Sequence, residues 1–220
     1  MKTRFIFAVA LLCLAGGAQA DTGRQVVIND GEYSKSGTDW VSGYAFSSGT
    51  ITINGGKFTA NATRWADGFY NYSDSIAIIN GGEFCGKASD WGFGFHNLGT
   101  VTINGGTFIG TATNWGVGLT NDSNATAIIT GGQFIGTSYF GSSGIENYGK
   151  IFIYGTFAQY GELSGYGGFI HGTLASGENI DIGYQNFGSI CLMPVPEPSS
   201  ILALLTGIAG LGGIALRRWK

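Results

Sequence analysis

A short sequence motif recurs along the chain and limits the folds that the chain can adopt. "TITINGGKF" at residues 50–58 is echoed by "TVTINGGTF" at residues 100–108 and by "ATAIITGGQF" at residues 125–134. The isoleucine before each glycine pair, or its equivalent, returns every 24 to 26 residues, at Ile28, Ile53, Ile79, Ile103, Ile129 and Ile153. A period of this length is typical of a solenoid, in which each repeat packs against its neighbours in the stack.

Three further columns of residues keep the same phase. One is tryptophan, at Trp40, Trp65, Trp91 and Trp115, with Gly141 in the fifth place. One is glycine, at Gly43, Gly68, Gly94, Gly118, Gly144 and Gly168, and one is asparagine, at Asn71, Asn97, Asn121 and Asn147. Biased composition alone does not keep four columns in phase, so each column is predicted to mark one position in successive coils.

Each repeat contains short strand-like pieces separated by turn residues. In "TVTIN", Val101 and Ile103 fall on one face and Thr102 on the other, and Asn-Gly-Gly supplies the positive φ angles of a sharp corner. Three strands in about 25 residues make one coil of a parallel β-helix. The sequence therefore predicts an all-β solenoid domain over residues 21–190, with about seven coils and the last two irregular. An antiparallel sandwich is the alternative, but its hairpins would not impose so long a period.

Stacking turns the columns into ladders along the axis. We expect the tryptophans to stack near a corner and the asparagines to bond to one another. Charges alternate in the columns Glu32, Lys57, Glu83 and Asp39, Arg64, Asp90, as neighbouring parallel strands would favour. The predicted lumen is filled by Val26/Ile28, Ile51/Ile53, Ala77/Ile79, Val101/Ile103, Ala127/Ile129 and Ile151/Ile153.

Both ends have the character of targeting segments. Residues 1–20 combine a basic start, an apolar run and small residues at Ala18 and Ala20, which predicts a signal peptide read by the secretion translocon and cleaved after Ala20. After a linker at 191–194, the apolar stretch 201–216 predicts a transmembrane helix in the inner membrane, stopped by Arg217 and Arg218 on the cytoplasmic side. The body is then expected in the periplasm before it reaches the cell surface.

Charge and cysteine content narrow the partners. Without the two end segments, 6 basic and 13 acidic residues remain, so the body is acidic and nucleic acid is a poor fit. Cys85 and Cys191 are far apart, and their spacing leaves a disulfide open.

Residues able to do chemistry are scattered, and we predict no catalytic, cofactor or metal site. Asp39 and Asp90 flank Arg64 and are interpreted as structural, while Glu146 and His171 could lie on adjacent coils but on opposite faces. The alternative is a β-helix that binds or processes polysaccharide. It would use Asp122 and Glu146 as acids, and the exposed tyrosines Tyr70, Tyr72 and Tyr148 as platforms for sugar rings.

The tail resembles the PEP-CTERM sorting signal of Gram-negative bacteria. Val195-Pro196-Glu197-Pro198 is followed by an apolar span and two arginines, and the resemblance covers residues 195–220. It implies that Pro196, Glu197 and Pro198 are recognised by an exosortase, a membrane protease or transpeptidase, and that the helix is a temporary anchor. The body more loosely resembles the β-helical repeats of secreted bacterial adhesins. Together these features predict an exported, non-enzymatic surface or matrix protein associated with exopolysaccharide.

Overall fold

The computed structural model describes residues 24–163 and 165–196, and these form eighteen β-strands and no helix. The predicted signal peptide, the transmembrane helix at 201–216 and most of the sorting signal lie outside the described residues. Within the described part, no helix is long and apolar enough to cross a membrane.

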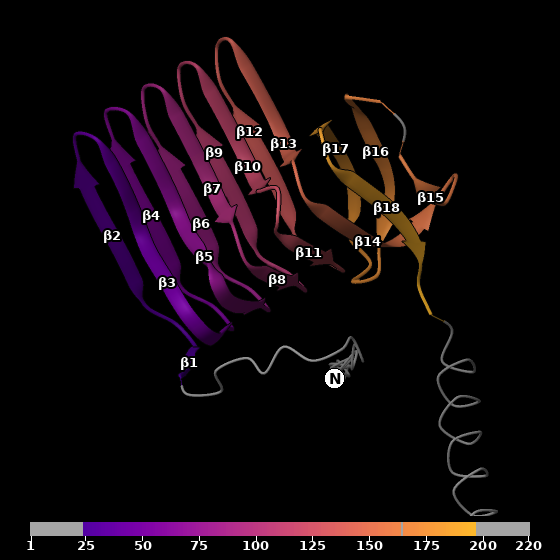
Figure 1. The fold of residues 1–220 in the computed structure, drawn as a ribbon, viewed down its shortest axis with the longest axis horizontal. Helices are drawn as coiled ribbons and strands as arrows, with labels where there is room; N and C mark the ends of the chain where they lie inside the picture. The colour runs from indigo at the N-terminus through magenta and orange to yellow at the C-terminus, as the bar shows by residue number, and fades with distance from the viewer. Residues whose placement is uncertain (1–23, 164, 197–220) are drawn as a thin grey trace, which may run out of the picture.

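The strands form a parallel β-helix, as the repeat predicts, and successive coils lie side by side along it (Figure 1). The first strand of each coil comes from β1 (Gln25–Ile28), β3 (Trp40–Ile53), β5 (Trp65–Ile79), β8 (Thr100–Ile103), β11 (Thr126–Ile129) and β14 (Lys150–Phe157). The second comes from β2 (Glu32–Gly37), β4 (Lys57–Ala62), β6 (Glu83–Lys87), β9 (Thr107–Thr111) and β12 (Gln133–Thr137). The third comes from β3 and β5 again, then β7 (Trp91–Asn97), β10 (Trp115–Asn121) and β13 (Gly141–Asn147). We call these the first, second and third stacks.

Five coils have a strand in all three stacks, fewer than the seven predicted. The second stack ends at β12, because after β14 the chain turns back into an antiparallel pair, β16 (Gly167–Leu174) and β17 (Asn179–Asn186). β17 then extends the third stack and β18 (Ser189–Pro194) extends the first, with β15 (Gly161–Glu162) at its edge. The segment 191–194, expected as a linker, is therefore part of β18.

The predicted lumen ladder is confirmed. Equivalent residues pair in register, as Ile53 does with Ile79 and Ile79 with Ile103, and all of the predicted lumen residues are buried except the half-buried Val26. The second glycine of each corner has positive φ, for example 106° at Gly106. The predicted charge columns also pair: Lys57 Nζ lies 2.9 Å from Glu83 Oε1, and Arg64 lies between Asp39 and Asp90.

An aromatic ladder in the core was not foreseen from the sequence. Its rings stack face to face, with centroids 4.8 to 5.1 Å apart, in the order Tyr33, Phe58, Phe84, Phe108 and Phe134. A shorter ladder of Tyr44, Phe69 and Phe95 packs edge-on against it. These rings fill the part of the lumen between the second and third stacks.

Beyond the rings, the second and third stacks close into a narrow arm, which contains the arches along one edge of the solenoid (Figure 1). Glycine lines its inside from β6 onward: Gly86, Gly110 and Gly136 in the second stack, Gly92 and Gly116 in the third. A Cβ atom on Gly110 would lie 2.0 Å from the carbonyl oxygen of Val117. The backbones thus meet directly, which only residues without a side chain allow.

The glycine column differs from the prediction at its last member. Gly43, Gly68, Gly94, Gly118 and Gly144 all sit close to neighbouring backbone, but Gly168 lies in β16, outside the third stack. Gly183 of β17 takes its place beside Gly144, because the antiparallel pair shifts the sequence away from the repeat.

The asparagine ladder is confirmed and lies inside the solenoid. The Nδ2 groups of Asn71, Asn97 and Asn121 donate to the next Oδ1 at 2.8, 2.8 and 2.9 Å, and Asn147 donates to Asn186 at 2.9 Å. A second, exposed ladder runs along the corner through Asn29, Asn54, Asn80 and Asn104, and here each amide donates to the asparagine of the preceding coil.

The two ladders provide a matched test of burial. Replacing Asn121 by alanine should lower the free energy of unfolding by about 2 kcal/mol, because buried amide groups of Asn97 and Asn147 each lose a partner. Replacing the exposed Asn80, whose partners can turn to water, should cost less than about 0.5 kcal/mol. Chemical denaturation followed by circular dichroism measures both. Equal losses would contradict the different burial of the ladders.

Candidate functional site

The outer face of the third stack gathers most of the polar and aromatic groups that could act on a ligand. Three outward columns run along it: the tryptophans from Trp40 onward, a column containing Asp67 and Phe93, and a column containing Tyr70, His96, Thr120 and Glu146. The predicted sugar platforms Tyr70, Tyr72 and Tyr148 lie on this face, as does Asp122 just after β10.

The tryptophans stack as expected, but on the outside of the solenoid. Trp65 and Trp91 are stacked with ring centroids 5.3 Å apart, and Trp91 and Trp115 are tilted at 6.1 Å. Trp65 is 38% exposed, so the ladder covers the surface and does not fill the lumen.

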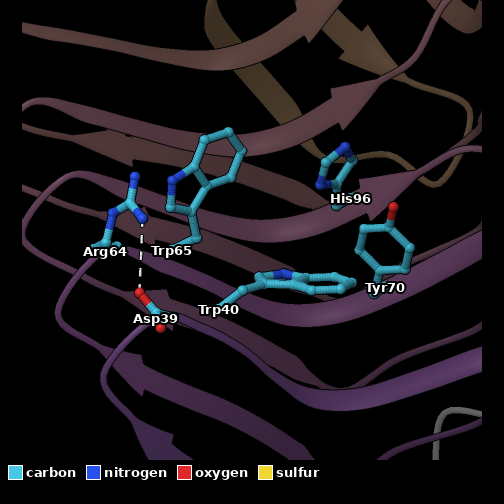
Figure 2. A pocket seen from close by; sticks show the side chains of 6 residues that line it. All are labelled: Asp39, Trp40, Arg64, Trp65, Tyr70 and His96. Atoms are coloured by element: carbon cyan, nitrogen blue, oxygen red, sulfur yellow. Dashed lines mark ion pairs between the residues drawn. The ribbon is translucent and has the colours of Figure 1, made fainter.

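Trp40 departs from this stack. Its Nε1–H donates to the carboxylate of Asp67, and its ring meets Tyr70 edge to face, with centroids 4.9 Å apart. An open hollow of about 520 Å³ lies beside the two indoles of Trp40 and Trp65, lined also by Tyr70 and His96, with Asp39 and Arg64 at its rim (Figure 2).

Asp67 is the fully buried acid of this face, and sequence reasoning missed its role. It accepts hydrogen bonds from Trp40 Nε1, from Ser42 Oγ at 3.4 Å and from His96 Nδ1 at 3.3 Å. The sequence did contain a clue to this role, because Asp67 is the charged residue in a column otherwise made of Ser42, Phe93, Val117 and Ser143. Its histidine partner could not be found from the columns, because His96 belongs to the adjacent one.

His96 is held between two carboxylates. Nδ1 faces Asp67, and Nε2 lies 3.7 Å from Asp122 Oδ2. Burial alone would lower the pKa of His96, but the hydrogen bonds and charges of Asp122 and Asp67 outweigh it and raise the pKa to about 9. The imidazolium therefore carries its proton at pH 7, with both ring nitrogens engaged.

Glu146 forms a second polar group further along the same face. It is buried, accepts from Tyr148 Oη at 2.8 Å and from Trp115 Nε1 at 3.3 Å, and has Thr120 as its register neighbour. Burial, followed by the bond to Glu146, raises the pKa of Tyr148 to about 12. The hydroxyls of Thr120 and Ser143 are buried on this face without a hydrogen-bond partner among the described residues.

Glu146 and His171 are not brought together. β17 lies between their strands, and His171 is exposed beside Asp181, with Nδ1 and Oδ1 3.1 Å apart. Cys85 and Cys191 are both free thiols. In the described part of the chain, no cluster of three histidine, cysteine or acidic side chains is placed to hold a metal ion.

Asp67 and His96 both have their polar atoms engaged within the protein. Asp67 is enclosed and bonded by three groups, and His96 has no free nitrogen lone pair to accept a proton from a substrate. The aromatic rings beside them remain partly open to solvent.

Comparison with protein-family models, with curated proteins and with solved structures found no match for the chain. Of the predicted sorting and cleavage residues, only Pro196 lies in the described part, where it is exposed just after β18. Ala18, Ala20, Glu197, Pro198, Arg217 and Arg218 lie outside it.

Proposed function

We propose that the protein is an exported, non-enzymatic surface or extracellular-matrix solenoid, sorted by an exosortase through its PEP-CTERM-like tail. The observation that carries this proposal is where the body ends. β18 stops at Pro194, paired along its length with β14, and Val195 and Pro196 are exposed immediately after it. Pro196, the first residue of the predicted tripeptide, is thus exposed two residues beyond the last strand, as recognition by a membrane enzyme requires.

The body suits a structural role at the cell surface. Its ladders of isoleucine, phenylalanine and asparagine repeat along the axis, so each coil is held by the same contacts as the next. The acidic charge of the body helps to keep such a rod soluble outside the cell.

The intact mass of the protein from membrane and external fractions of its host tests the sorting proposal. We expect a product that starts at Asp21 and ends near Pro196–Pro198 in the external fraction, because both targeting segments are removed. A product that keeps Arg217–Lys220 and occurs only in the membrane fraction would contradict it.

A second candidate function is polysaccharide binding, and the outer face of the third stack favours it. Aromatic rings, carboxylates and a guanidinium occur together there, and this combination suits sugars, which present both C–H faces and hydroxyl groups. Polysaccharide processing has less support, because the best-placed acid, Asp67, is enclosed.

A further inference from the structure

The hollow between Trp40 and Trp65 marks the place where the tryptophan ladder is interrupted. The two residues are register neighbours, and the next two pairs of tryptophans approach to 5.3 and 6.1 Å. Trp40 instead leans toward Tyr70, so the two indoles border an open space (Figure 2). The exposed fractions of Trp40 and Trp65, 49% and 38%, leave ring surface available on both.

Contacts within the protein hold Trp40 away from Trp65. The buried carboxylate of Asp67 holds the indole N–H of Trp40 and is itself fixed by Ser42 and His96. Tyr70, which meets Trp40 edge to face, also packs against His96 with centroids 4.9 Å apart. The aromatic wall is therefore positioned before any ligand arrives, which reduces the entropy lost on binding.

The rim adds hydrogen-bonding groups. Arg64 Nη1 lies 3.6 Å from Asp39 Oδ1, and its side chain is 62% exposed against 82% for Asp39. This loose, wet pair offers donors and acceptors together, and a third charge, Asp90, lies on the far side of Arg64 at 4.0 Å. Because Arg64 is already balanced by carboxylates, the rim gives an anionic ligand no advantage.

We infer that this hollow is a subsite for one neutral pyranose unit of a polysaccharide. The apolar C–H face of the sugar packs on the indole of Trp40 beside Trp65, and its neighbouring hydroxyls donate to Asp39 and accept from Arg64. A sugar hydroxyl can do both, which suits a rim of mixed sign. The inference deepens the second candidate function and rests on it, but is independent of the sorting proposal.

The test is calorimetric titration of the full chain with neutral hexasaccharides of β-1,4-linked glucose, mannose and N-acetylglucosamine, and with an anionic hexagalacturonate. We expect one neutral series to bind and the Trp40→Ala variant to lose at least about tenfold in affinity, as for a central aromatic anchor. Tyr160→Ala is the control: it removes an exposed aromatic side chain between β14 and β15, away from the hollow and from the tryptophan ladder, and should bind like the parent protein. Circular dichroism establishes that both variants are folded.

The other outcomes separate the site from the function. If the parent protein bound a neutral sugar and Trp40→Ala bound it equally well, the hollow would not be the binding site, although polysaccharide binding would stand. The same conclusion would follow if both variants lost affinity equally. Binding of the galacturonate alone would overturn the neutral ligand. If no sugar bound, and the chain also migrated unretarded in gels containing the exopolysaccharide of its host, both this inference and the second candidate function would fall.

Discussion

Replacing Gly110 by alanine is expected to destabilise the protein by about 3 kcal/mol, the upper end of the usual cost of overpacking. The added Cβ would lie 2.0 Å from Val117 O and 2.3 Å from Gly92 O, both backbone atoms that cannot rotate away. The arm cannot widen at this coil alone, because Gly86 and Gly136 hold the neighbouring coils equally close. This loss of stability is opposite to the intrinsic preference of a strand, in which alanine is favoured over glycine by roughly 0.5–1 kcal/mol.

Gly183→Ala is the control for this prediction. Gly183 also lies in a strand, β17, but a Cβ there would meet only the ring of Phe169, at an ordinary 3.6 Å. We expect its unfolding free energy to be unchanged or slightly raised in urea denaturation. If Gly110→Ala were as stable as Gly183→Ala, the backbones of the arm could not be in direct contact.

The stability of the protein is expected to fall by about 3 kcal/mol as the pH rises from 6.5 to 9, because of His96. Its folded pKa of about 9 lies above the usual histidine pKa of 6.5, so the folded state binds the proton more tightly than the unfolded state. The stabilisation is therefore complete below pH 6.5 and is lost as the pH passes through 9. Asp67 and Asp122 are the charges that face the ring, and the side chain is only 13% exposed, which limits screening by solvent.

His96→Gln isolates this effect from other titrating groups. Its amide can still donate to one carboxylate, but it takes up no proton. The difference in unfolding free energy between the parent protein and this variant should be large at pH 6 and should narrow by about 3 kcal/mol at pH 9.5. A difference that is the same at both pH values would mean that His96 is not held as an ion between Asp67 and Asp122.

Much of the fold could be predicted from the repeat, because in-register stacking places each column on itself. Ile53 and Ile79 had to meet, as did Asn97 and Asn121, and the alternating charges of Lys57 and Glu83 agreed with that register. The count of coils could not be predicted in the same way. "YGTF" at residues 154–157 is close to the repeat, yet β14 is followed by an antiparallel pair that sits where the next coil would continue.

Most of the candidate site could not be predicted from the sequence. Tyr70 and Tyr72 were predicted to be exposed and are half-buried on this face. Asp67 and His96 are 29 residues apart, which is one coil plus an offset between columns, so no shared column relates them. Their contact depends on how side chains lean across neighbouring strands.

The sequence by itself determined the period, the parallel register and the residues that meet their own equivalents, since a repeat stacked on itself allows one pairing. Only the tertiary structure decided that the asparagine ladder lies inside the solenoid and the tryptophan ladder outside it. The phenylalanines fill the wider part of the lumen. In the glycine arm the backbones of the second and third stacks touch, so no side chain fits between them and the tryptophans lie on the surface. There, Trp40 donates a hydrogen bond to the buried carboxylate of Asp67 and does not stack on Trp65, which leaves the hollow open. Leaving a buried carboxylate without a hydrogen bond costs more free energy than leaving an exposed indole without a stacking partner.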